Sequence, residues 1–279
     1  MEYKKLSNGV EMPMLGYGVY QVTPEECTRC VRDAIEVGYR AIDTAQAYSN
    51  EAEVGRAIVE SGISRQELFI TSKIWISNFG QEAAARSIDE SLRKLGTDYI
   101  DLMLLHQPYN DYYGAYRALE EAYRAGKLRA IGVSNFYPGR LVDLYNFTEV
   151  KPMVNQIETH PFFQRDEDHK WMDKYGVAHT SWAPFDEGKK GIFTHPLISS
   201  IADKHGKTTG QVILRFLLQN DVILIPKTTH RERMIENMDI FDFTLDADDM
   251  ARMRTLDEGQ SSFFDHNSPE ASEMVYGWV

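Results

Sequence analysis

Residues 81–96, QEAAARSIDESLRKLG, and residues 99–106, YIDLMLLH, decide the fold class of this chain. The first stretch has a helical pattern, and Gly96 stands where such a helix would end. The second stretch is a short, mostly apolar run, which is typical of a buried strand. A helix followed directly by a strand is one step of an alternating βα chain.

The same alternation runs along the rest of the sequence. We predict a hairpin over residues 3–13 with Asn8-Gly9 as its turn, and helical patterns that include residues 208–220 and a closing unit from Arg231. Eight strands, each followed by a helix, are predicted at residues 15–19, 39–43, 68–73, 99–106, 128–134, 152–157, 177–182 and 222–227.

Eight such units without Pro/Gly-rich linkers fit a (β/α)₈ TIM barrel, in one domain spanning residues 1–279. The stretch 257–279 is predicted to be an irregular tail that folds over one end of the barrel. Two doubly wound halves are the alternative. No G-x-G-x-x-G follows an early strand, which weakens the dinucleotide-binding version of that alternative.

Composition limits the possible partners. The 279 residues include 42 acidic and 30 basic side chains, giving a formal charge of −12, which disfavours binding to nucleic acid. Any anionic ligand must therefore be held by a local cluster of cations. No stretch approaches the roughly 18 consecutive apolar residues of a membrane helix, and residues 1–13 lack the apolar core of a signal peptide. We expect a cytoplasmic protein, and a monomer because nothing argues for an interface.

The two cysteines, Cys27 and Cys30, form a C-x-x-C in EECTRCVRD. A redox pair is one interpretation. The favoured interpretation is that both lie on one face of the helix after TPEE, since residues three apart share a face. No second cysteine pair or ligand-spaced histidine cluster accompanies them, so no metal site is expected.

Four polar residues stand at or near the carboxyl ends of three adjacent predicted strands. Asp43 ends the second strand, and Tyr48 lies in the loop beyond it. Lys73 ends the third strand and His106 the fourth. Barrel enzymes place their chemistry at this end of the strands. Each residue alone could be structural, but four together indicate a site.

Together the four residues make a proton-donating site. A free tyrosine has a pKa of about 10, and a nearby ammonium is expected to lower it. Asp43 would keep Lys73 charged and oriented. His106 would donate a hydrogen bond to a carbonyl oxygen and orient it against the Tyr48 hydroxyl, which then protonates that oxygen.

Five segments carry a resemblance to a known family: YRAIDTAQAYSNEAEVGRAI, TSKIW, LLHQP, GVSNF and VNQIE. In sequence and spacing they resemble the aldo-keto reductases over essentially the whole chain, and the late segments SWAPFDEGKKG and PKTTHRERMIENMDIFDF are similar to the bacterial 2,5-diketo-gluconate reductases. The resemblance implies that Asp43, Tyr48, Lys73 and His106 form a catalytic tetrad. It also implies a nicotinamide cofactor bound without a Rossmann motif.

By this resemblance, Ser134, Asn135 and Gln156 hydrogen-bond the nicotinamide carboxamide, and Trp182 stacks on the nicotinamide ring. The segment after the last strand would hold the adenosine end, including the 2′-phosphate of NADPH. Its expected contacts are Lys227, Thr228, Arg233, Glu236 and Asn237. His230 stands where the 2,5-diketo-gluconate reductases carry arginine, which weakens the expected preference for NADPH over NADH. NADPH is still favoured because of the other contacts, and NADH is the weaker alternative.

The substrate side departs from the family pattern. Gln107 follows the catalytic histidine where many relatives have tryptophan, and Tyr20 and Trp75 are expected to line the pocket. Residues 109–114 and the tail from Ser261 are expected to cover it. The acidic, tyrosine-rich rim argues against diketo-gluconate itself and leaves small aldehydes, dicarbonyls and sugar-derived ketones open.

The sequence therefore predicts NADPH-dependent reduction of aldehydes or ketones to alcohols, with Tyr48 as proton donor and a small carbonyl compound as substrate. One alternative is a cofactor-binding regulatory protein of the same fold with little turnover. Another is a barrel isomerase or lyase without cofactor, which would leave the segment from Lys227 to Arg233 and Trp182 without a purpose. Since fold alone does not fix function, the prediction depends on the site residues.

Overall fold

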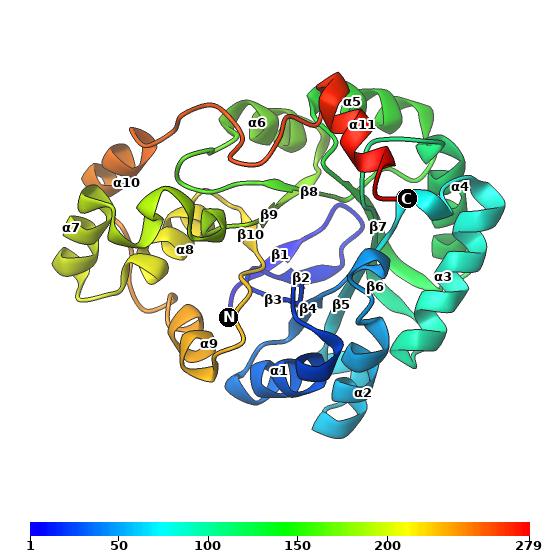
Figure 1. Ribbon diagram of the computed structural model, residues 1–279, viewed down its shortest axis with the longest axis horizontal. Coiled ribbons are helices and arrows are strands. Elements are labelled where there is room, and N and C mark those ends of the chain that lie inside the picture. The colour runs from blue at the N-terminus through cyan, green and yellow to red at the C-terminus, as the bar shows by residue number, and fades with distance from the viewer.

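The computed structural model describes residues 1–279, and Figure 1 shows a ring of strands surrounded by helices. Eight parallel strands form one sheet in the order β10-β9-β8-β7-β6-β5-β4-β3. Two further strands, β1 and β2, form an antiparallel hairpin. The strands are β1 Tyr3–Lys5, β2 Glu11–Pro13, β3 Tyr17–Gly18, β4 Ala41–Asp43, β5 Phe69–Ile74, β6 Ile100–Leu105, β7 Leu128–Ser134, β8 Val154–Glu158, β9 Ala178–Trp182 and β10 Ile223–Leu224.

Backbone hydrogen bonds between the first and last strands close the sheet into a barrel. Leu15 and Leu224 form a parallel bridge. The Gly16 N–H donates to the Leu224 carbonyl at 2.7 Å, and the Gly18 N–H donates to the Pro226 carbonyl at 3.2 Å. The predicted (β/α)₈ barrel is therefore confirmed, and the doubly wound alternative is wrong.

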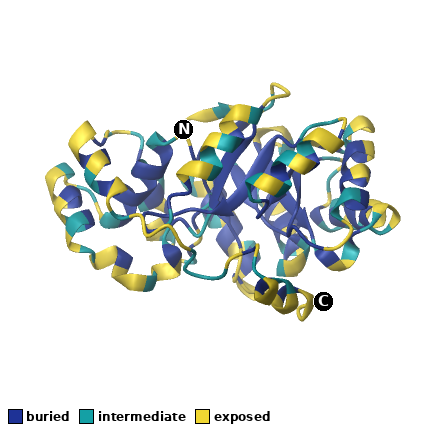
Figure 2. Ribbon diagram, turned by 90° about the horizontal axis from the view of Figure 1, so that it is seen from above, coloured by how far each residue is buried: buried dark blue, intermediate teal, exposed yellow.

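The helices surround the strands and pack their apolar faces on them (Figures 1 and 2). Local signals set their ends: Thr208 and Gln211 form a capping box at the start of α8, and Gly96 adopts the left-handed conformation after α3. The α-helices are α1 Pro24–Val37, α2 Glu51–Ser61, α3 Gln81–Leu95, α4 Tyr112–Arg124, α5 Pro138–Phe147, α6 Asp166–Tyr175, α7 Pro196–His205, α8 Thr209–Gln219, α9 Arg231–Met238, α10 Ala247–Arg254 and α11 Pro269–Tyr276. Short 3₁₀ segments are η1 Gln46–Tyr48, η2 Arg65–Glu67, η3 Ile76–Asn78 and η4 Asp186–Thr194.

The two chain ends lie on opposite sides of the buried strands (Figure 2). The hairpin covers the amino end of the barrel, where the Asn8 amide donates to the backbone of Arg129 near the start of β7. The tail lies at the carboxyl end, where Ser261 binds Glu158 at the end of β8. The predicted tail is irregular up to residue 268 and then forms α11, a short helix that the sequence analysis missed.

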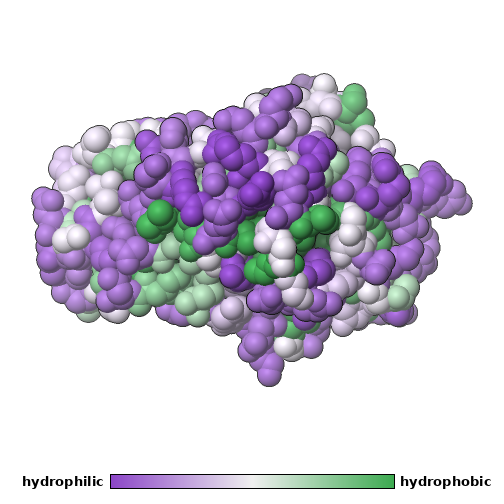
Figure 3. Space-filling view, turned by 90° about the horizontal axis from the view of Figure 1, so that it is seen from below, coloured by the Kyte–Doolittle hydropathy of each residue, from purple (hydrophilic) through white to green (hydrophobic).

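One continuous hydrophobic cluster of 71 buried residues runs from Leu6 to Val275. Cys27 and Cys30 belong to it as free thiols on the buried face of α1, as the helical interpretation predicts. Burial raises the pKa of the Cys27 thiol to about 12, which makes it a poor redox group. The face in Figure 3 is mostly hydrophilic with a central hydrophobic band. None of the helices combines the length and the apolar character that a membrane-spanning segment requires.

Candidate active site

A cavity of about 1070 Å³ lies at the carboxyl ends of the barrel strands. Strand ends, η4 and the C-terminal tail all contribute to its wall. Every site residue predicted from the sequence lines this cavity, except Lys73, which is fully buried behind it. The cavity is therefore large enough to be a binding site, and it brings the predicted residues together.

Lys73 on β5 contacts both partners that the sequence predicts for it. Its ammonium lies 2.5 Å from Oδ1 of Asp43 and donates to the Tyr48 hydroxyl at 3.3 Å and to the Thr44 carbonyl at 2.9 Å. Lys73 is 0% exposed and Asp43 is 3% exposed, so the ion pair has almost no contact with water. Burial lowers the pKa of Lys73, while the Asp43 carboxylate opposes that shift.

Tyr48 ends η1, and its loop is held by a residue that the sequence analysis missed. Oε1 of Gln46 accepts hydrogen bonds from the Trp75 N–H at 3.0 Å and from the Asn78 amide at 2.9 Å, and its amide donates to the Ser87 carbonyl. These bonds tie η1 to η3 and α3. The Tyr48 ring is only partly buried, while its hydroxyl points inward to Lys73.

The pKa of Tyr48 shifts in the direction opposite to the expected one. Burial raises the pKa of Tyr48 well above that of a free tyrosine, and the Asp43 carboxylate adds to the rise. Desolvation therefore outweighs the ammonium, whose charge is already shared with Asp43. Tyr48 is a protonated phenol in this arrangement, which is the form that can donate a proton.

His106 follows β6 directly and packs beside Tyr48, with ring centroids 5.6 Å apart. Burial lowers the pKa of His106 well below that of a free histidine, and the charge of Lys73 adds to the effect. Its Nδ1 is buried and has no partner. The ring is therefore a neutral imidazole with one N–H. This N–H can donate a hydrogen bond to a carbonyl oxygen, and the ring adds no positive charge to the site.

The expected carboxamide contacts form one connected group. Trp182 Nε1 donates to Oδ1 of Asn135 at 2.8 Å, and the Asn135 amide donates to Ser134 Oγ and to the His106 carbonyl. Asn135 has a φ of 65°, a left-handed conformation that asparagine tolerates better than most residues. The Gln156 amide donates to Oδ2 of Asp43, so its carbonyl oxygen is the atom left for a ligand.

The expected adenosine contacts lie at the other end of the cavity. Lys227 and Arg233 are exposed, and neither forms an ion pair. Thr228, Glu236 and Asn237 line the same wall, and Thr228 and Asn237 are buried. His230 is exposed and does not line the cavity.

The substrate side contains the expected Tyr20, Trp75 and Gln107. The tail covers it as expected and adds side chains that the sequence analysis did not single out: Phe263, Phe264, His266 and Trp278. The expectation for residues 109–114 is wrong, because none of them lines the cavity. Tyr109 instead supports the tail from behind, where its hydroxyl donates to the His266 carbonyl at 2.8 Å.

Residues 9–258 match the Aldo/keto reductase family. The chain belongs to the aldo-keto reductase family. Among similar proteins, glyoxal reductase of Bacillus subtilis (strain 168) is 45% identical over 92% of this chain and 93% of its own length. Methylglyoxal reductase DkgA of Escherichia coli (strain K12) is 40% identical over 92% of this chain and 94% of its own.

Solved structures agree with this assignment. An aldo-keto reductase of Bombyx mori in complex with NADP superimposes with a TM-score of 0.90 at 30% identity, over 98% of this chain and 96% of that one. A putative 2,5-diketo-D-gluconic acid reductase B superimposes with a TM-score of 0.89 at 40% identity, over 95% of both chains. This aldo-keto reductase is accordingly an oxidoreductase, and its family uses nicotinamide cofactors.

The cavity fits a nicotinamide cofactor. One end offers amide and hydroxyl groups beside an indole ring, which suits a carboxamide on an aromatic ring. The other end offers two unpaired cations in a protein with a formal charge of −12. Such cations suit phosphate groups.

Proposed function

We propose that this chain reduces small aldehydes and α-dicarbonyl compounds to alcohols, with NADPH as cofactor and Tyr48 as proton donor. The observation that carries the proposal is the position of the Tyr48 hydroxyl, which lies 3.3 Å from the buried Lys73 ammonium and faces the cavity beside His106. A protonated phenol and a neutral imidazole side by side can bind one carbonyl oxygen from two directions.

Each residue of the tetrad has its own role in the proposed reaction. The bound nicotinamide supplies the hydride that adds to the carbonyl carbon. His106 holds the carbonyl oxygen, and Tyr48 transfers its hydroxyl proton to that oxygen as negative charge develops there. Lys73 stabilises the phenolate that remains, and Asp43 keeps Lys73 charged.

The choice of NADPH rests on Lys227 and Arg233. Both line the cavity and neither is neutralised by a carboxylate of the chain. A 2′-phosphate would supply the missing negative charge, while the hydroxyl of NADH would not. NADH is therefore the weaker alternative. The NADP complex of the Bombyx mori relative is consistent with this choice.

The substrate class follows from the cavity and from the names of the relatives. Tyr20, Trp75 and Phe264 give the substrate side an aromatic wall, and Gln107 and His266 add hydrogen-bonding groups. A small carbonyl compound with a second oxygen atom would pack on the aromatic side chains and hydrogen-bond to the polar ones. Glyoxal and methylglyoxal, which the similar bacterial reductases are named for, have this chemistry.

The test is the loss of NADPH absorbance with glyoxal, methylglyoxal and simple aldehydes, comparing wild type with Tyr48→Phe. We expect kcat to fall by about 10³-fold or more in the variant, because a general acid contributes about 10²–10⁴-fold, while the Kd for NADPH changes little. Tyr145→Phe is the control, because Tyr145 packs on Tyr175 and does not line the cavity. Wild-type turnover in Tyr48→Phe would disprove the proton-donor role.

The other outcomes separate the alternatives. Tight NADPH binding without turnover on any carbonyl compound would favour the regulatory protein, and no NADPH binding would favour the isomerase or lyase without cofactor. We further infer that residues 1–279 act as one domain, since one hydrophobic cluster extends over them. The monomeric state and the cytoplasmic location stay predictions, and light scattering tests the first.

A further inference from the structure

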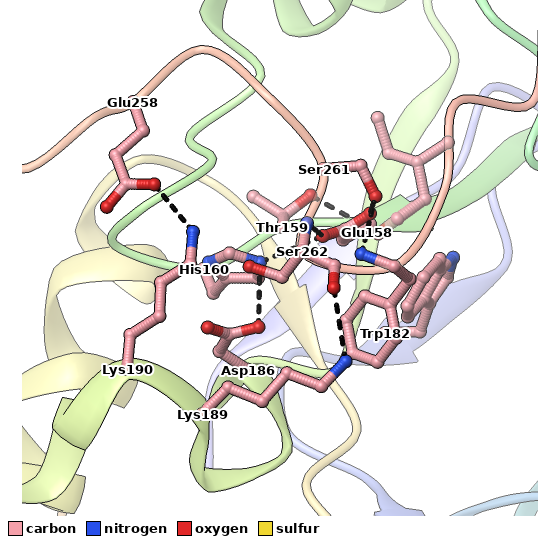
Figure 4. A network of polar contacts seen from close by, with 12 residues as sticks. Glu158, Thr159, His160, Trp182, Asp186, Lys189, Lys190, Glu258, Ser261 and Ser262 are labelled. Carbon is pink, nitrogen blue, oxygen red and sulfur yellow. Dashed lines mark hydrogen bonds and ion pairs between the residues drawn. The ribbon is translucent and has the colours of Figure 1, made fainter.

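Outside the cavity, an imidazole and two carboxylates meet in the interior of the protein (Figure 4). Glu158 ends β8, His160 follows two residues later, and Asp186 begins η4. Their exposed fractions are 1%, 0% and 0%. None of them belongs to the proposed active site, and no metal is expected from the sequence.

Asp186 lacks the partners that a buried carboxylate needs. Neither of its oxygens accepts a hydrogen bond, although the residue is fully buried. The nearest basic atom is Nε2 of His160, which lies 3.5 Å from Oδ1 of Asp186. An isolated charge in such a place is costly, so buried carboxylates are normally paired, hydrogen-bonded or bound to a metal.

The three groups lie close enough together to share one metal ion. Nε2 of His160 lies 3.0 Å from Oε1 of Glu158 and 3.5 Å from Oδ1 of Asp186. One ligand atom from each residue lies within 4.8 Å of a ligand atom of the other two. Zinc binds nitrogen and oxygen at about 2.0–2.2 Å, which places neighbouring ligands of a tetrahedral site about 3.3–3.6 Å apart.

We propose that Glu158, His160 and Asp186 bind a divalent metal ion of the zinc type. Two carboxylates would balance its charge, and a single imidazole with two oxygen ligands suits zinc and its neighbours better than magnesium or calcium. The hydroxyl of Ser262, in the neighbouring tail, is also buried without a partner. The Ser262 N–H already binds Oε1 of Glu158 at 2.9 Å.

The site would be structural, because it joins three segments that frame the cavity. Glu158 holds the tail by accepting hydrogen bonds from Ser261 Oγ and from the Ser262 N–H. On the η4 side, Lys189 donates to the Ser262 carbonyl, and Lys190 pairs with Glu258 (Figure 4). A metal at Asp186 would fix η4 to β8 and to the tail.

A proton is the competing occupant of the same site. An N–H on Nε2 of His160 could bridge Glu158 and Asp186 without any metal, since both carboxylates are near this atom. In that arrangement one N–H would be shared between two acceptors, and the Nδ1 of His160 would keep no partner. Metal content distinguishes the two occupants directly.

The experiment uses tag-free protein, stripped with a chelator and then incubated with Zn²⁺ in excess and desalted. We expect one retained equivalent of zinc by elemental analysis, and visible d–d absorption when Co²⁺ replaces Zn²⁺. With free Zn²⁺ at about 100 times its Kd, the unfolding temperature should rise by about 5–10 °C. Asp186→Asn and His160→Gln should each abolish the bound equivalent and the temperature shift.

Two controls make the result specific. Glu258→Gln changes a carboxylate of the same network that is paired with Lys190, and it should keep the zinc. His169→Gln removes the other close histidine pair, in which Nδ1 of His169 lies 2.9 Å from Nδ1 of His179. Absence of retained zinc in the wild type, or zinc that persists in Asp186→Asn but disappears in His169→Gln, would overturn the proposal. If Asp186→Asn does not fold, His160→Gln and the Co²⁺ spectrum decide.

Discussion

The Gln156 amide donates a 2.9 Å hydrogen bond to Oδ2 of Asp43, across the barrel from β8 to β4. The other carboxylate oxygen of Asp43 binds Lys73. Gln156 thus orients the acid that orients the lysine, in addition to its expected contact with the cofactor. From the sequence, Gln156 is expected to contact the carboxamide alone, because no local pattern reveals which strands face each other across a barrel.

Gln156→Leu tests this second role. The change leaves Oδ2 of Asp43 buried without a donor, which should cost about 1–3 kcal/mol of unfolding free energy. Gln107→Leu is the matched control, because Gln107 also lines the cavity but contacts no carboxylate. Urea unfolding of both variants measures the difference. A Gln156→Leu protein with weaker NADPH binding but unchanged stability would show that the contact with Asp43 contributes nothing.

The buried ion pair gives a second prediction. Lys73→Met leaves the Asp43 carboxylate without its cation, so we expect a loss of about 3–5 kcal/mol in stability together with loss of turnover. The double variant Asp43→Asn, Lys73→Met removes both charges and should be more stable than Lys73→Met alone. Denaturant unfolding of the single and double variants gives the coupling energy. Additive effects would mean that the two charges do not stabilise each other.

The preference for NADPH gives the third prediction. Arg233→Ala removes a cation from the cavity wall, and a lost charge-assisted hydrogen bond of about 1.5–3 kcal/mol corresponds to a rise in KM for NADPH of about 10–150-fold. The KM for NADH should change little. Arg231→Ala is the matched control on α9, because Arg231 is paired with Asp33 and Glu36. Equal changes for both cofactors would place the 2′-phosphate elsewhere.

Much of the fold could be predicted because the barrel repeats one local pattern. Each predicted strand overlaps an observed one, and Gly96 ends α3 as its position suggests. The strands are shorter than predicted at β3 and β10, where the barrel closes through one bridge, from Leu15 to Leu224, rather than a long ladder. The helix α11 was missed because it is short and partly polar, and it lies among residues that favour loops.

From the sequence, it was easier to predict which residues form the site than to predict the chemistry of those residues. Motifs identified Tyr48 and Lys73, but the direction of the Tyr48 pKa depends on burial, which sequence does not reveal. His266 and Asp186 were missed for a related reason. Each is a single polar residue in an irregular segment, and only the folded chain shows that it is buried with unpartnered atoms.

His266 gives the last prediction, which concerns pH. Burial lowers the pKa of His266 to about 3, and the charges of Arg165 and Arg140 add to the effect. The unfolded chain binds this proton near pH 6.5 and the folded chain does not, so the stability contributed by neutral His266 is complete above pH 6.5 and is lost as the pH falls towards 3. Between pH 7.5 and pH 5, wild type should therefore lose about 2 kcal/mol more unfolding free energy than His266→Gln. His230→Gln, at an exposed position, should keep the wild-type pH dependence. Urea unfolding at both pH values measures these losses, and the same loss in wild type and His266→Gln would mean that other buried groups, such as His106 or His179, set the acid sensitivity.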